Sequence, residues 1–180
     1  MSTEDPIFNE KYIPLFDSSE STRKALLRNL FAALQEHAPN LAKKFADHTL
    51  TVLDVGTGKG KFVDLLTDTG LRNAFGIERN KNLGTEMRKM KQGGRVVIGE
   101  TQAMPYKDES FELVTCFGAL DGSYYKNNYK KFFDEVYRVL KKGGVFFTLD
   151  AIYDIPSESY AGFRVLASVA EGRPIMLIKD

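Results

Sequence analysis

The chain has 180 residues, of which 43% are hydrophobic, and a formal net charge of +1 at pH 7, as expected for one compact domain. Its single cysteine, Cys116, excludes an intramolecular disulfide framework, and no apolar stretch approaches the ~20 residues of a membrane span. The near-neutral charge gives no general attraction to polyanions, so nucleic-acid binding is not implied.

The first quarter of the chain is expected to contain one amphipathic helix. Residues 17–20 (DSSE) offer an N-cap, and leucines at positions 26, 27, 30 and 34 recur at helical spacing until Pro39 interrupts the pattern. The first residues are acidic where a secretory signal is basic and then apolar, so a cytoplasmic location is expected. We therefore expect residues 1–48 to form an N-terminal helical segment that belongs to the same domain as a core over residues 49–180.

Strand and helix patterns alternate through that core. The expected strands are 51–55, 74–78, 95–98, 112–117 and 145–149, and the expected helices are 61–68, 82–91 and 127–140, the last closed by Gly143 and Gly144. This alternation predicts a parallel sheet with helices on both faces. Two further extended runs, 163–170 and 173–179, flank a Glu-Gly turn and predict an antiparallel hairpin. The fold class is therefore α/β, with a doubly wound, mostly parallel, seven-stranded sheet.

A glycine-rich turn follows the first strand of the core. Residues 52–60 read VLDVGTGKG, in which Asp54 precedes glycines at positions 56, 58 and 60. Glycines at a strand-to-helix junction allow a ligand to approach the backbone closely. Glu78 ends the next strand, where a carboxylate would meet a ribose diol. The pattern favours a cofactor that contains adenosine.

Two other nucleotide sites fit this turn less well. A phosphate-binding P-loop requires glycine at the position of Val55 and a hydroxyl at the position of Phe62. A dinucleotide fingerprint requires its third glycine at the position of Lys61 and is disfavoured.

The turn resembles motif I of the class I S-adenosylmethionine-dependent methyltransferases, and two later segments support this resemblance. Residues 99–114 (GETQAMPYKDESFELV) are similar to the family segment G-D-A-x-x-L-P-F-x-D-x-S-F-D-x-V. Residues 135–149 (EVYRVLKKGGVFFTL) resemble E-x-x-R-V-L-K-P-G-G followed by a strand, with Lys142 in place of proline. The resemblance implies the Rossmann-like methyltransferase fold with an antiparallel seventh strand.

The resemblance also implies a cofactor site for S-adenosylmethionine. The turn would face the methionine and ribose portions, Glu78 would accept both ribose hydroxyls, and Glu100 and Thr101 would meet the adenine. The full set of implied cofactor-binding residues is Asp54, Gly56, Thr57, Gly58, Gly60, Glu78, Arg79, Glu100, Thr101, Gln102, Phe117 and Gly118. No metal is expected, because the two histidines show no ligand spacing.

The expected activity is methyl transfer by in-line displacement to an oxygen, nitrogen or carbon acceptor, which the sequence does not identify. Asp121 is the candidate base, because its loop lies where acceptors bind in this family. The acceptor is either a small molecule or a macromolecule, and a partner subunit is a further possibility. Residues 1–18 are expected to act as a lid. A non-catalytic methyltransferase-fold scaffold or activator subunit and a nicotinamide-linked oxidoreductase remain alternatives.

Overall fold

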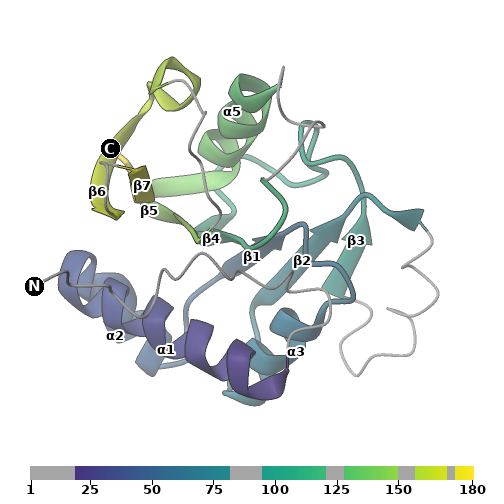
Figure 1. Cartoon of the computed structure of the whole chain (residues 1–180), viewed down its shortest axis with the longest axis vertical. Coiled ribbons are helices and arrows are strands. Elements are labelled where there is room, and N and C mark those ends of the chain that lie inside the picture. The colour runs from purple at the N-terminus through teal and green to yellow at the C-terminus, as the bar shows by residue number, and fades with distance from the viewer. Residues whose placement is uncertain (1–18, 82–94, 121–127, 150–156, 170–172) are drawn as a thin grey trace, which may run out of the picture.

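The computed structural model describes residues 19–81, 95–120, 128–149, 157–169 and 173–180 (Figure 1). The strands are β1 Val52–Val55, β2 Ala74–Glu78, β3 Val96–Ile98, β4 Phe111–Cys116, β5 Leu140–Thr148, β6 Phe163–Val169 and β7 Arg173–Lys179. The described helices are α1 Glu20–His37, α2 Pro39–Ala46, α3 Lys61–Asp68 and α5 Tyr129–Val139, with a short 3-10 helix η4 Ser157–Tyr160. The helix expected at 82–91 lies outside the described residues.

The strands form one seven-stranded sheet in the order β3-β2-β1-β4-β5-β7-β6. The strands from β1 to β5 pair in parallel, and β7 pairs antiparallel with both β5 and β6. This confirms the doubly wound, mostly parallel sheet and its C-terminal antiparallel hairpin. The chain order reverses between β1 and β4, and the crevice at such a switch point is where open α/β sheets bind ligands.

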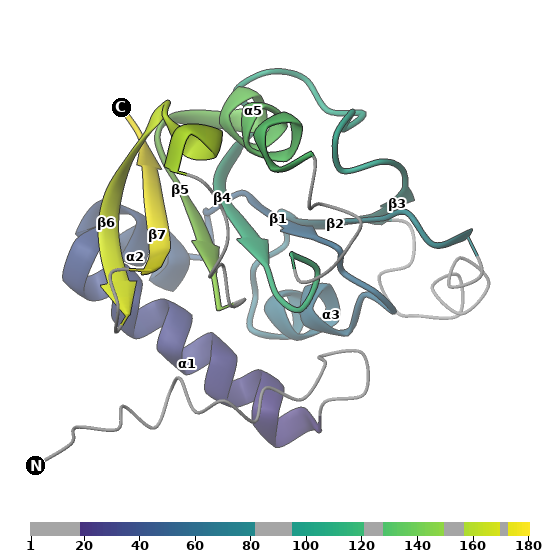
Figure 2. The ribbon, with the colours of Figure 1, turned by 45° about the horizontal axis from the view of Figure 1, so that its top comes forward.

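Helices cover both faces of the sheet (Figures 1 and 2). One hydrophobic cluster joins α1, α2 and α3 to one face, and a second joins α5 to the other. The leucines at positions 26, 30 and 34 of α1 are buried in the first cluster. The N-terminal helices therefore form part of the layer that covers the sheet.

The N-terminal region contains two helices where the sequence pattern predicts one. Ser19 caps α1 as expected, because its side chain accepts a hydrogen bond from Thr22 N at 3.2 Å. Pro39 ends the first helical pattern, but it also begins α2 at a position where its fixed φ and missing N–H cost nothing. The predicted amphipathic helix is therefore confirmed as α1, whereas α2 was not predicted, because proline can begin a helix as well as interrupt one.

The junction between α5 and β5 also differs from the expectation. Helix α5 ends at Val139 and β5 begins at the next residue, Leu140, so the predicted strand start at residue 145 is wrong. Phe111 of β4 pairs with Leu140, whereas Leu113 pairs with Val145, so β5 contains a bulge. Gly143, with a φ of +72°, lies in this bulge and does not close the helix.

A buried carboxylate ties the N-terminal helices to the amino edge of the sheet. Glu112 of β4 accepts hydrogen bonds from Lys44 Nζ of α2 and from the N–H and hydroxyl of Thr51, the latter two at 3.0 Å. Lys141 adds a charge at 3.8 Å. Burial opposes ionisation of this carboxyl, but the hydrogen bonds and the nearby charge outweigh it and hold the pKa of Glu112 below its ordinary value.

Glu112 should make the stability depend on pH. Because its folded-state pKa is lowered, its contribution is complete above the unfolded-state value of 4.5 and disappears as the pH falls through the folded-state value. We expect Glu112→Gln to lower the free energy of unfolding at pH 7 by about 1–3 kcal/mol and the loss to shrink in acid. Urea unfolding at several pH values measures this. Glu20→Gln, which changes an exposed partner of Lys24, is the control, and equal losses in both variants would contradict the assignment.

Candidate functional site

Two buried carboxylates lie at the carboxyl ends of neighbouring strands. Asp54 of β1 is 4% exposed, and its Oδ1 accepts a hydrogen bond from Thr115 Oγ1 of β4 at 2.8 Å. Glu78, the last residue of β2, is 6% exposed. Strands β1 and β2 are neighbours and parallel, so their carboxyl ends lie on the same side of the sheet. Both carboxylates therefore lie on the side where the topology predicts a ligand crevice.

The turn that follows β1 has three residues in the left-handed region. The φ angles are +69° at Gly56, +57° at Gly58 and +74° at Gly60. A Cβ on Gly56 would lie 2.3 Å from the Cβ of Ala119, which follows β4. The turn itself therefore requires glycine, in addition to any requirement of a ligand.

Hydrogen bonds fasten this turn to the end of β2. The N–H groups of Gly56 and Thr57 donate to the carbonyl oxygen of Ile77 at 2.9 and 3.2 Å. The N–H of Gly58 donates to Glu78 Oε2 at 2.9 Å, and Asn80 N donates to Glu78 Oε1 at 2.8 Å. Each carboxylate oxygen has a second lone pair, so Glu78 retains capacity for further donors.

A pocket opens between this turn, β4 and helix α1. Its empty volume, counting the open solvent at its entrance, is about 390 Å³. The rings of Phe62 and Phe117 meet edge to face at 5.1 Å on its apolar side. The lining residues are Arg23, Asp54, Thr57, Lys59, Lys61, Phe62 and Phe117.

Two buried polar atoms, in the segments that follow β1 and β3, have no hydrogen-bond partner among the described residues. They are Thr57 Oγ1, in the glycine turn, and Gln102 Nε2, in the loop after β3. An unsatisfied buried polar group costs about 1–3 kcal/mol, so such groups require an explanation. A polar ligand that spans the turn and this loop would satisfy both.

Side chains of helix α5 form hydrogen bonds with the backbone of the loop after β3. Met104 N donates to Glu135 Oε2 at 2.6 Å, and Arg138 donates to the carbonyl oxygens of Met104 at 3.0 Å and Tyr106 at 2.7 Å. The Arg138 hydrogen bond outweighs the effect of burial and holds the pKa of Glu135 below its ordinary value. These two residues belong to the segment that resembles E-x-x-R, and their contacts fix the backbone next to Gln102.

The structure places the expected site residues with different degrees of burial. Thr101 is 1% exposed and Phe117 is 5% exposed, whereas Arg79 and Glu100 are exposed. Gly118 has a φ of +75°. Asp54, Thr57 and Phe117 all line the pocket. Glu78 is connected to the glycine turn by the hydrogen bond that it accepts from Gly58 N. Asp121 and the expected lid at residues 1–18 lie outside the described residues.

Four residues that line the pocket were not predicted: Arg23, Lys59, Lys61 and Phe62. Three of them lie within or beside the glycine turn, where the alternation of lysine and glycine was a usable signal. Arg23 lies in α1, and no spacing in the sequence connects it to the turn.

Among the described ranges, no three or more His, Cys, Asp or Glu side chains form a cluster that would hold a metal ion. No described helix is long and apolar enough to cross a membrane.

A family model described as a methyltransferase domain matches residues 53–148, which is more than half of the chain. Protein MJ1123 of Methanocaldococcus jannaschii is 29% identical over 139 residues, covering 76% of this chain and 56% of that protein. The chain spans about half the length of the curated relatives it matches.

Two solved structures show the same fold. The PH0226 protein of Pyrococcus horikoshii has a TM-score of 0.53 and 23% identity, covering 74% of this chain and 59% of that one. The [4+2]-cyclase SpnF has a TM-score of 0.53 and 22% identity, covering 66% of this chain and 52% of that one.

The cost of the contact between a Cβ at position 56 and Ala119 can be measured separately from the cost of a left-handed backbone. Gly56→Ala places a methyl group against Ala119, whereas Gly143→Ala, at a similar φ, meets nothing within 4 Å. We expect thermal unfolding to show a loss of about 1–2 kcal/mol at Gly143 from strain alone and a loss at least twice as large at Gly56. Equal losses would show that the contact with Ala119 relaxes without cost.

The contribution of Arg138 to fixing the loop after β3 can be measured against a second variant in the same helix. Arg138→Met removes hydrogen bonds to two backbone carbonyls and to Glu135 and should lower the free energy of unfolding by about 2–4 kcal/mol. Lys130→Met, on the same helix, removes an exposed ion pair with Asp134 and should cost no more than about 0.5 kcal/mol. Chemical denaturation measures both, and a similar small loss in each would show that the loop is held by other contacts.

Proposed function

This chain belongs to the class I S-adenosylmethionine-dependent methyltransferase family, and we propose that it moves the methyl group of S-adenosylmethionine to an oxygen, nitrogen or carbon acceptor by in-line displacement. The observation that carries the proposal is the pair of buried carboxylates, Asp54 and Glu78, on either side of a left-handed glycine turn. A cofactor with an ammonium group and a ribose diol supplies hydrogen-bond donors for both carboxylates.

The described residues fit the parts of this cofactor. Glu78, already fixed by Gly58 and Asn80, has lone pairs free for two ribose hydroxyls. The orphaned amide of Gln102 and the buried Thr101 support an adenine site after β3. Gly56 and Gly60 shape the backbone beneath the cofactor, and Gly118 continues this surface after β4.

The remaining residues of the proposed site would contact the methionine portion and the outer edge of the cofactor. Asp54 and Phe117 would face the methionine portion, because both line the pocket with Thr57. Arg79 and Glu100 are exposed, so their contacts with the cofactor would lie at its outer edge.

The protein's main contribution to the chemistry would be positioning. The sulfonium supplies an activated methyl group, so the protein must hold the acceptor atom in line with the S–CH₃ bond and accept its proton. Such positioning supplies up to about 7–11 kcal/mol in favourable cases. We assign the role of base to Asp121 and acceptor enclosure to residues 1–18, as proposals from the sequence.

Cofactor binding is the first test. Calorimetry should show binding of S-adenosylmethionine and S-adenosylhomocysteine and none of NAD. Glu78→Gln should weaken both affinities about tenfold or more, because a charged hydrogen-bond acceptor is lost. The control is Glu109→Gln, which changes a side chain that is 60% exposed and should leave both affinities unchanged. Binding of NAD alone, or of no ligand, would overturn the proposal.

Transfer itself requires a second measurement, because the fold is shared with a protein described as a cyclase. Cell extract incubated with methyl-labelled cofactor and the protein should yield a labelled product that is absent when the protein is omitted or heat-inactivated. Binding without transfer to any acceptor would favour a scaffold role.

A further inference from the structure

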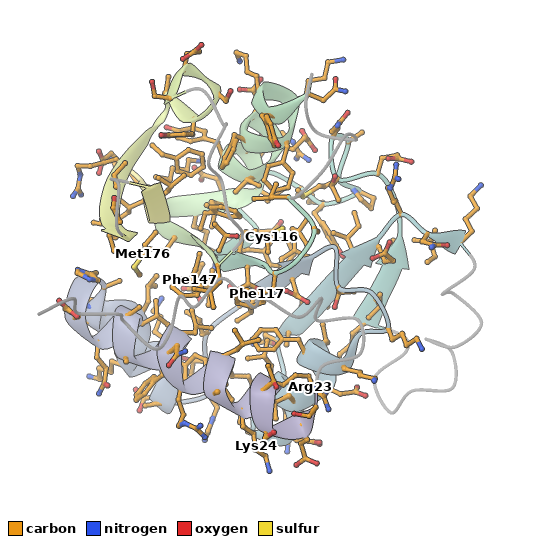
Figure 3. All side chains as sticks on the ribbon, viewed as in Figure 1. Arg23, Lys24, Cys116, Phe117, Phe147 and Met176 are labelled. Atoms are coloured by element: carbon orange, nitrogen blue, oxygen red, sulfur yellow. The ribbon has the colours of Figure 1, made fainter. Side chains whose placement is uncertain are left out.

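Helix α5 and the pocket lie on opposite sides of the sheet. Figure 3 shows Arg23 and Phe117, two residues that line the pocket, on the side that α1 covers. Helix α5 covers the other side (Figure 2), and none of its residues is among those that line the pocket. A side chain of α5 therefore acts on a bound cofactor by setting the position of backbone that contacts it.

Glu135 is the centre of the contacts that α5 makes with the loop after β3. Its Oε2 accepts the N–H of Met104 at 2.6 Å, and its two oxygens accept from Arg138 Nε at 2.7 Å and Nη2 at 2.8 Å. The side chain of Glu135 is 17% exposed, so solvent screens these charges less than it screens a surface pair. Arg138 also donates to the carbonyl oxygens of Met104 and Tyr106. The loop is thus held by its N–H and its C=O groups.

The backbone that these bonds hold is adjacent to the two groups that support an adenine site. Thr101 is 1% exposed, and Gln102 Nε2 is buried without a hydrogen-bond partner among the described residues. Ala103 N donates to Glu100 O at 3.2 Å, so residues 100–103 form a tight turn. Met104 follows this turn directly, so a displacement of Met104 also displaces the side chains within the turn.

We propose that Glu135 is a positioning residue for recognition of the adenine base; this inference rests on the proposed function. The charged hydrogen bond to Met104 fixes the loop, and the loop groups that face the edge of the base need accurate placement to form hydrogen bonds with it. Asp54 and Glu78 belong to other elements, so their contacts with the rest of the cofactor do not depend on Glu135.

The test is calorimetry of the full chain with S-adenosylhomocysteine and S-inosylhomocysteine. The inosine form has an oxygen in place of the 6-amino group and a hydrogen on the adjacent ring nitrogen, so donors and acceptors are exchanged at one edge of the base. We expect the wild type to prefer the adenine form about tenfold or more. Glu135→Ala should weaken binding of the adenine form about tenfold and of the inosine form less than about threefold, so most of the preference disappears.

Two further variants separate positioning from stability. Glu135→Gln keeps an acceptor for Met104 N and should retain only part of the preference, which keeps the test decisive if Glu135→Ala does not fold. Asp134→Ala changes the neighbouring residue and removes an exposed ion pair with Lys130. This control should bind both ligands as the wild type does.

Equal losses with both ligands would overturn the inference, because they would show that Glu135 supports only the fold. An unchanged preference in the Glu135 variants, or a wild type that binds both ligands equally, would overturn it as well. In these cases the wild type still binds S-adenosylhomocysteine, and the proposed function stands. Failure of the wild type to bind either ligand would reject the proposed function together with the inference.

Discussion

The carboxylate of Glu78 is the group on which the geometry of the site depends. A buried charge must be compensated, and here two backbone N–H groups provide that compensation, one from Gly58 and one from Asn80. The same contacts fix the turn after β1 against the end of β2. The crevice therefore has its shape before a ligand arrives, and little of the binding free energy is lost in ordering the turn.

The same device recurs at two other places in the fold. Glu112 accepts the N–H of Thr51 before β1, and Glu135 accepts the N–H of Met104 after β3. In each case a carboxylate on one element satisfies a backbone donor in a segment that leads into or out of the sheet. Because charged hydrogen bonds are stronger than neutral ones, these contacts define the positions of segments that have little apolar surface to bury.

The central strands and α3 could be predicted because local residues decide them. Helix α3 and strands β2 and β7 have the predicted bounds, since the apolar pattern marks each of them and glycines flank α3 and precede β7. Other features depend on tertiary context. Pro39 begins a helix because another ends beside it, Gly143 relieves a bulge that only the partner strand β4 reveals, and Arg23 reaches the site only through the packing of α1. Nothing in the local sequence specifies these three.

The direct passage from α5 into β5 restricts how this protein can change in evolution. No loop separates Val139 from Leu140, so an inserted or deleted residue could be absorbed only in the bulge between Leu140 and Val145. Outside that bulge, such a change would rotate the helix by about 100° or turn every side chain of the following strand to the opposite face. Substitutions at this junction alter one contact at a time, whereas a change of length displaces a whole layer, so the spacing between these elements is more constrained than the residues that occupy it.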